Sequence, residues 1–124
     1  MSTASILLVE PHKETRTELT QALEQNFNVY ACASPKEAQK KLNQEDISLI
    51  ISETNFPKKQ SGYPFFEKVK STKATQNIPI IVISNESNTA DRIRSLTIGV
   101  AHHLEKPLSG EELATLATIT ISKT

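Results

Sequence analysis

The chain has 124 residues, and its 14 lysines and arginines balance its 14 aspartates and glutamates, so that the formal net charge is zero. We expect one domain over residues 1–124, with a core at about residues 5–117, that is stable without disulfides. The balanced charge provides no long-range field that attracts nucleic acid or an anionic membrane surface. Apolar stretches are shorter than the roughly 20 residues of a membrane span, and a signal-peptide pattern is missing, so we expect a cytoplasmic protein.

The composition also disfavours two kinds of cofactor site. The three glycines lie too far apart to form the phosphate-binding loop of a P-loop or dinucleotide-binding protein. One cysteine and three histidines give neither a CxxC pair nor an HExxH motif, so no zinc site is expected. Cys32 lies in an apolar run and is interpreted as a core residue rather than a reactive thiol.

Short runs rich in isoleucine, valine and leucine alternate with longer amphipathic stretches. The runs predicted to form strands are residues 5–10, 28–32, 47–52, 78–84 and 100–104. Three of the five are almost continuously apolar, which is typical of strands covered on both faces in a parallel sheet.

Three helices are predicted in the first half of the chain. Residues 15–25 place apolar side chains at i, i+3 and i+4, starting from Leu19. Serine, proline and glutamate within residues 34–37 form a capping box that starts the second helix. Phe65 and Phe66 indicate the third helix, and because adjacent side chains cannot both point fully inward, we expect one of them to be only partly covered.

Two more helices are predicted in the second half. Ile93 and Leu96 mark the fourth helix, which ends at Gly99. A capping box at residues 109–112 starts the fifth. The final residues, 118–124, are too rich in β-branched side chains to predict a helix.

Five consecutive β-α units predict an α/β domain in which a doubly wound parallel sheet lies between two helical layers. Functional sites of such sheets lie at the carboxyl ends of the strands. The polar residues and prolines expected at that edge are Glu10, Pro11, His12, Glu53, Thr54, Asn55, Ser84, Asn85, Glu105, Lys106 and Pro107.

Over about residues 5–116, the sequence resembles the receiver domain of bacterial two-component response regulators. The resemblance is carried by ILLVEPH (6–12), LIISETNFP (49–57), PIIVIS (79–84) and IGVAHHLEKP (98–107). It implies a CheY-like, flavodoxin-like (βα)5 fold and a signalling module rather than an enzyme, with no catalytic residues. It implies protein partners, either a histidine kinase or an output domain. The implied contact surface comprises the fourth helix, fifth strand and fifth helix, roughly residues 89–117, and a homodimer would also use it.

In that family, two acids after the first strand and an aspartate after the third hold Mg²⁺, and the aspartate accepts a phosphoryl group. A hydroxyl and a lysine then bind the phosphoryl oxygens. The resemblance places Glu10 at the first acidic position, Ser84 at the hydroxyl position and Lys106 at the lysine position. Asn55 retains a backbone carbonyl that a metal ion could use.

Three positions depart from the family pattern. Pro11 replaces the second acid and has no side-chain oxygen for Mg²⁺, which requires near-octahedral oxygen ligands. Glu53 replaces the acceptor aspartate, and its extra methylene displaces the nucleophile by about 1 Å, which can cost on the order of a hundredfold in rate. His103 replaces the aromatic switch residue. The loop at residues 57–62 is also one residue longer than usual.

We therefore interpret the chain as an atypical receiver, or pseudo-receiver, that lacks cofactors and binds Mg²⁺ weakly or not at all. Its Glu53 is expected to meet Lys106 and Ser84 directly and to mimic part of a phosphoryl group. The alternative for Glu53 and Lys106 is an ordinary ion pair at the edge of the sheet, but their joint position at the functional edge favours the site interpretation. Two other functions stay open: a working receiver phosphorylated at Glu53 or a nearby hydroxyl (Ser52 or Thr54), and a small flavodoxin-like nucleotide or flavin binder.

Two histidines are interpreted structurally. His103 is expected to be half-buried with a satisfied hydrogen bond rather than a pH switch. His12 is expected to face solvent in the first helical turn.

Overall fold

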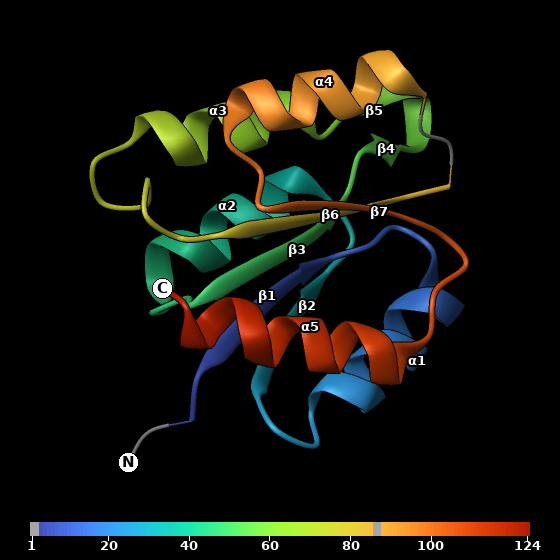
Figure 1. Ribbon diagram of the computed structural model, residues 1–124, viewed down its shortest axis with the longest axis vertical. Helices are drawn as coiled ribbons and strands as arrows, with labels where there is room; N and C mark the ends of the chain where they lie inside the picture. The colour runs from blue at the N-terminus through green and yellow to red at the C-terminus, as the bar shows by residue number, and fades with distance from the viewer. Residues whose placement is uncertain (1–2, 86–87) are drawn as a thin grey trace.

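Five apolar segments form one parallel sheet in the computed structural model, which describes residues 3–85 and 88–124 (Figure 1). The strand order is β2-β1-β3-β6-β7. The strands are β1 (Ser5–Val9), β2 (Asn28–Cys32), β3 (Leu49–Glu53), β6 (Ile80–Ser84) and β7 (His102–Glu105). The predicted doubly wound α/β fold is confirmed.

Helices and one small hairpin connect these strands. The helices are α1 (Lys13–Leu23), α2 (Pro35–Gln44), α3 (Tyr63–Ser71), α4 (Thr89–Ile98) and α5 (Gly110–Ser122). The hairpin follows β3 and consists of β4 (Asn55–Phe56), the 3-10 turn η1 (Pro57–Lys59) and β5 (Gln60–Ser61). None of the helices in the described ranges is both long and apolar enough to cross a membrane.

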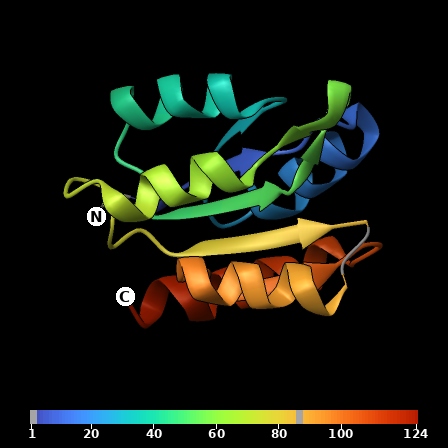
Figure 2. The same cartoon turned by 90° about the horizontal axis from the view of Figure 1, so that it is seen from above.

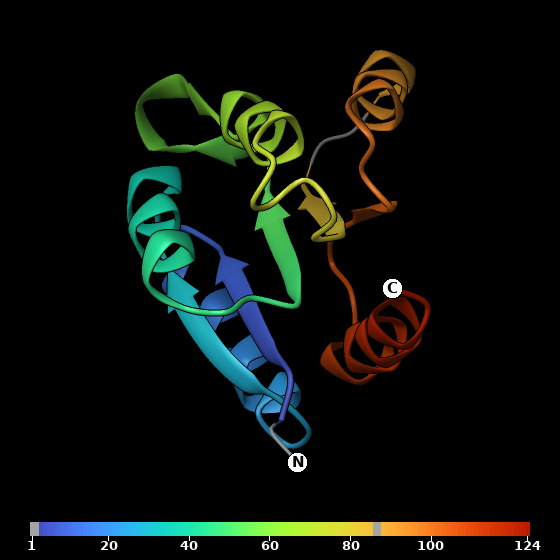
Figure 3. The same ribbon diagram turned by 90° about the vertical axis from the view of Figure 1, so that its left-hand side faces the viewer.

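Helices lie on both faces of the sheet (Figure 3). Two apolar clusters hold the layers together, one on each face. Alternate side chains of β1 show the division, since Ile6 and Leu8 pack toward α1 and α5 whereas Leu7 and Val9 pack toward α2 and α3. Figure 2 shows α2, α3 and α4 following one another across the sheet in chain order. The three central strands β1, β3 and β6 are covered on both faces and are nearly continuously apolar, as the sequence predicts.

The prediction that one of the two adjacent phenylalanines is only partly covered is wrong. Phe65 is 6% exposed and Phe66 is fully buried, and both belong to one apolar cluster. That cluster also contains Phe56 of the hairpin, so α3 is covered from the hairpin side as well as from the sheet. A helix covered on two sides can bury two successive aromatic rings.

No helix was predicted for residues 118–124, and the structure corrects this, because α5 continues to Ser122. Thr118 and Thr120 donate their hydroxyl protons to backbone carbonyls four residues earlier, at 3.0 and 2.7 Å. Thr120 is buried, and Ile121 packs against the cluster beneath α5. Tertiary burial therefore outweighs the weak helix propensity of this β-branched stretch.

The fourth helix forms as predicted, but its apolar side faces solvent rather than the core. Gly99 ends it with φ 103°, in the left-handed region that favours glycine. Ile93 and Leu96 point to solvent, with 58% and 66% of their surfaces exposed, and the buried residue of the helix is Ser95. The two apolar residues thus locate the helix in the sequence but do not form its core face.

Candidate functional site

A buried lysine joins two buried glutamates at the carboxyl edge of the sheet. The Lys106 ammonium lies 2.5 Å from Glu10 Oε1 and 2.8 Å from Glu53 Oε1. Glu10 directly follows β1, Glu53 is the last residue of β3, and Lys106 directly follows β7, so the carboxyl ends of three parallel strands meet at this site. Both glutamates are at most 2% exposed, which places the ion pairs in a region of low dielectric constant.

The environment of Lys106 favours its charged form. Burial alone lowers the pKa of the Lys106 amine, but hydrogen bonds and charge attraction from Glu10 and Glu53 outweigh burial and raise it above the usual value of 10.5. The ammonium therefore remains charged across the physiological range. The expectation that Glu53 meets Lys106 is confirmed.

Glu10 is held from both of its carboxylate oxygens. Oε1 accepts from Lys106, and Oε2 accepts from the backbone N–H of His12 at 3.0 Å. The backbone carbonyl of Glu10 accepts from the guanidinium of Arg16 at 2.8 Å, and that of Pro11 accepts from the same group at 3.3 Å. The oxygens at the end of β1 therefore already have internal donors.

Glu53 is held in the same way by the residues that follow it. Its Oε2 accepts from the backbone N–H groups of Thr54 at 2.6 Å and Asn55 at 3.0 Å, while Oε1 faces Lys106. The chain turns back over this segment at Gly62, whose N–H donates to the Thr54 carbonyl at 2.8 Å. A Cβ at Gly62 would lie 2.9 Å from the Glu53 carbonyl oxygen, so the close approach requires glycine.

Ser84 reaches Glu53 indirectly, which corrects the expectation of a direct contact. The Ser84 hydroxyl lies 3.0 Å from the Thr54 hydroxyl, and Thr54 donates to Glu53 Oε2 at 3.2 Å. The Thr54 hydroxyl therefore links the Glu53 carboxylate to Ser84. The sequence places Thr54 at this edge and among the alternative acceptors, but the bridge from Thr54 to Ser84 was not predicted.

The oxygen donors at this edge do not match a Mg²⁺ site. Pro11 supplies no side-chain oxygen, and the carboxylates of Glu10 and Glu53 are engaged by Lys106 and main-chain N–H groups. Asn55 turns its N–H toward Glu53, and its side chain is exposed. Within residues 3–85 and 88–124, no group of three or more histidine, cysteine, aspartate or glutamate side chains is arranged to hold a metal ion.

His103 of β7 contacts α4 rather than the glutamates. Its Nδ1 lies 2.8 Å from the hydroxyl of Ser95, a fully buried residue of α4. Burial, the main cause, and the charge of Arg92 lower the pKa of the His103 ring below its ordinary value of 6.5 against the opposing charges of Asp91, Glu105 and Glu53. The half-buried position with a hydrogen bond is as predicted, while the partner Ser95 was missed.

Two residues from the sequence analysis lie outside the ion cluster. His12 is exposed and caps α1, where its Nδ1 accepts from the backbone N–H of Thr15 at 3.3 Å. Cys32 is buried, as predicted, and burial is the main cause that raises the pKa of its thiol to about 11. A thiol with that pKa is a poor nucleophile at neutral pH.

Comparisons with known structures agree with this fold. A receiver domain protein from Methanospirillum hungatei superimposes with a TM-score of 0.90 at 20% identity, covering 98% of this chain and 96% of that one. The receiver domain of a signal transduction histidine kinase from Syntrophus aciditrophicus gives 0.86 at 26% identity, covering 98% and 92%.

Sequence comparisons identify the family. The probable transcriptional regulator ycf29 of Pyropia yezoensis is 33% identical over 101 residues, which are 82% of this chain and 45% of the relative. The aerobic respiration control protein ArcA of Escherichia coli is 27% identical over 125 residues, covering 100% and 51%. The chain thus spans about half the length of these relatives. The family described as response regulator receiver domain matches residues 6–118, and the chain belongs to that family.

Proposed function

We propose that this receiver domain is a pseudo-receiver, which transmits a signal through protein contacts without Mg²⁺-dependent phosphorylation. The observation that carries the proposal is the engagement of the Glu53 carboxylate, whose two oxygens are bound by Lys106 and by backbone N–H groups. A carboxylate that is buried and bound on both sides is poorly placed for in-line attack on a phosphoryl donor.

In this proposal the Glu53 carboxylate mimics the phosphoryl group of a phosphorylated receiver. It brings a negative charge to within 2.8 Å of Lys106, the residue that binds phosphoryl oxygens in the family. The mimicry is partial, because a carboxylate carries one charge and two oxygens whereas a phosphoryl group carries about −1.5 to −2 and three acceptor oxygens. Substitution of Glu53 by glutamine should change the conformation and partner affinity, and unchanged values for both would contradict this part of the proposal.

Loss of Mg²⁺ binding is the second part of the proposal. The missing oxygen at Pro11 and the internal ion pairs of Glu10 and Glu53 support it. Binding of a divalent cation would require Lys106 to leave two buried carboxylates, with no second acid at the end of β1 to compensate.

The test is incubation with Mg²⁺ and a small-molecule phosphoryl donor, followed by measurement of the intact mass. We expect no adduct on the wild-type chain. The matched variant Pro11→Asp with Glu53→Asp restores both acids and should gain one phosphate. A second variant, Pro11→Asp with Glu53→Asn, lacks the acceptor and reports modification elsewhere. A stable phosphate adduct on Glu53 of the wild-type chain would overturn the proposal.

The same experiment decides between the alternatives. Phosphate on Ser52 or Thr54 would indicate a working receiver with an unusual acceptor, but both hydroxyls are buried and hydrogen-bonded, which favours the pseudo-receiver. A nucleotide or flavin that remains bound through purification would indicate the third function. Fold alone does not support that function, since the phosphate-binding glycines are missing.

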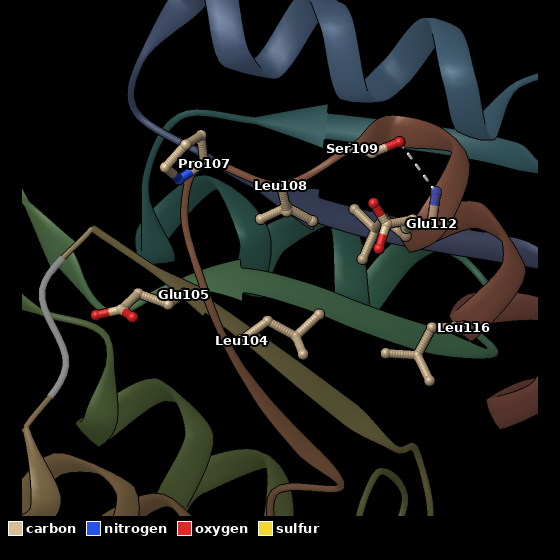
Figure 4. Close-up of a pocket in the computed structure, with 8 residues that line it drawn as sticks. Leu104, Glu105, Pro107, Leu108, Ser109, Glu112 and Leu116 are labelled. Atoms are coloured by element: carbon tan, nitrogen blue, oxygen red, sulfur yellow. Dashed lines mark hydrogen bonds between the residues drawn. The ribbon is translucent and has the colours of Figure 1, made fainter.

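We further propose that the partner is a histidine kinase or an output domain in the cytoplasm, and that it binds the surface formed by α4, β7 and α5. Figure 4 shows a groove there between β7 and α5, lined by Leu104, Leu108 and Leu116 with acidic groups beside them. Ile93 and Leu96 of α4 add exposed apolar area. Partly exposed apolar side chains of this kind are typical of protein contact surfaces.

A second copy of the chain is one possible partner for this surface. Light scattering across a range of concentrations will show whether the chain dimerises. Leu96→Glu should weaken binding to any partner that uses α4, whereas Lys68→Glu, at an exposed position of α3, is the control. Equal effects of the two variants on partner affinity would contradict the assignment of this surface.

A further inference from the structure

The fourth helix is held in place mainly by polar contacts. Its buried residue is Ser95, and its large apolar residues Ile93 and Leu96 face solvent. Ile98, in the last turn, is the residue of α4 that packs against an apolar cluster, and it is only partly buried. Apolar burial therefore contributes little to holding α4 on the sheet, and hydrogen bonds contribute a larger share than in the other helices.

Polar contacts link α4 to β7 and to α3, and one of them is an exposed ion pair between Arg94 of α4 and Glu67 of α3 at 3.7 Å. On the side of β7, Ser95 bonds to His103 at 2.8 Å. On the side of α3, the Tyr63 hydroxyl donates to the Asp91 carbonyl at 3.3 Å, and the Arg94 guanidinium lies 4.1 Å from the centre of the Tyr63 ring. Of these groups, only the His103 ring changes charge between about pH 5 and pH 8.

Protonation of the His103 ring is energetically unfavourable because of the position of its second nitrogen. Nε2 is buried and has no hydrogen-bond partner among residues 3–85 and 88–124. A neutral ring satisfies one nitrogen through Ser95, whereas a protonated ring carries a second N–H donor that must find an acceptor or reach water. A buried N–H without an acceptor is unfavourable, so protonation favours movement of the ring away from Ser95.

The charged groups around the ring come from three elements. Asp91 and Arg92 lie on α4, Glu105 on β7 and Glu53 on β3. The three acids attract a proton to the ring, while Arg92 and burial oppose it, and the pKa of His103 is lowered overall. Arg92 and Glu105 take part in other interactions as well, and Glu53 is bound to Lys106.

We propose that the His103–Ser95 hydrogen bond is a proton-sensitive latch, which holds α4 on the sheet when the ring is neutral and releases it on acidification. The inference rests on the proposed function in one respect, because α4 carries the apolar residues of the proposed contact surface. The latch would make that surface depend on pH in a domain that does not use phosphorylation. This proposal replaces the initial interpretation of His103 as a purely structural residue.

The test is amide hydrogen exchange of the full chain from about pH 8 to pH 5, with no partner, Mg²⁺ or phosphoryl donor present. Protection factors of α4 amides should fall with pH, by about tenfold for each unit by which the His103 pKa differs between the latched and released states. Amides of α5 are the internal reference, because that helix packs through buried apolar residues.

Three variants separate the latch from a general effect of acid. His103→Asn keeps a hydrogen-bonding group near the position of Nδ1 but cannot titrate, so its α4 protection should be independent of pH. Ser95→Ala removes the bond and should give low α4 protection at every pH. His102→Asn changes an exposed neighbour on the same strand and should behave like the wild-type chain.

Two outcomes would overturn the latch. One is α4 protection that follows α5 at every pH, and the other is the same pH dependence in His103→Asn as in the wild-type chain. If His103→Asn does not fold, an NMR titration of the wild-type His103 ring replaces it, and ring and α4 signals that titrate at different pH values would contradict the latch. These outcomes are independent of the phosphate measurement, so failure of the latch is distinguishable from failure of the proposed function.

Discussion

The helices α4 and α5 lie on opposite faces of the sheet, and they are held there by different kinds of contact. Leu113 and Ala117 of α5 are fully or almost fully buried in an apolar cluster, whereas α4 buries only a serine. Apolar burial does not depend on protonation, but a hydrogen bond to a histidine does. The difference supports the proposal that the position of α4, unlike that of α5, depends on the protonation state of His103.

The largest expected effect comes from the ion cluster, where the side chains of two buried glutamates share one lysine whose side chain is 8% exposed. Lys106→Met leaves Glu10 and Glu53 without their shared cation and should lower the free energy of unfolding by about 3–5 kcal/mol in urea denaturation. Lys68→Met, on an exposed side chain, is the control. A deficit below that of Ser95→Ala would show that buried charge pairing is not a major contributor here.

The contribution of Lys106 to the free energy of unfolding also depends on pH in the alkaline range. Because its pKa is raised in the folded chain, the stabilisation is fully present below the ordinary value of 10.5 and is lost as the pH rises through the folded-state value. It is therefore constant across the pH range in which the latch is tested.

The comparison between the two helices can be tested directly with leucine truncations. Leu113→Ala on α5 removes a buried side chain and should cost about 2–5 kcal/mol in the free energy of unfolding. Leu96→Ala on α4 removes an exposed side chain and should change it by less than about 0.5 kcal/mol. Similar losses in the two variants would show that α4 is held by apolar contacts after all.

A smaller effect on the free energy of unfolding is expected from the hydrogen bond between Ser95 of α4 and His103. Ser95→Ala removes the partner of the His103 ring and should lower the free energy of unfolding by about 1–3 kcal/mol, because it leaves a buried ring nitrogen unsatisfied. Thr97→Ala, on the exposed side of the same helix, is the control for helix propensity. Loss of equal size in both variants would assign the effect to the helix rather than to the hydrogen bond.

The smallest effect is the dependence of stability on pH. The pKa of His103 is lowered on folding, so its contribution is fully present above the ordinary value near 6.5 and is lost as the pH falls toward the folded-state value. Urea denaturation at several pH values should therefore show a component between about pH 7 and pH 5 that His103→Asn lacks. Parallel curves for the two chains would show that the ring titrates alike in the folded and unfolded states.

The alternation of strands and helices could be predicted from the sequence, as could the positions of Glu10, Glu53, Ser84 and Lys106 at one edge. Both follow from local pattern, because apolar runs and capping residues act over a few neighbours. The parallel topology then brings the strand ends together without further information. The meeting of Glu53 with Lys106 was predictable for that reason.

Other features depended on contacts between distant segments. Ser95 and His103 are eight residues apart and Thr54 and Ser84 are 30 apart, and no local pattern pairs their hydroxyl and ring groups. Burial of both Phe65 and Phe66 required the hairpin beside α3, and the helical end of α5 required the cluster beneath Ile121.

The sequence by itself determined which elements form and which side chains reach the carboxyl edge of the sheet. Only the tertiary structure decided which face each helix presents, and α4 shows why. Apolar spacing reports that Ile93 and Leu96 share a side of the helix, but whether that side is buried depends on the elements around it. In this protein the elements packed against α4 bury Ser95, and the apolar side of the helix remains exposed to solvent.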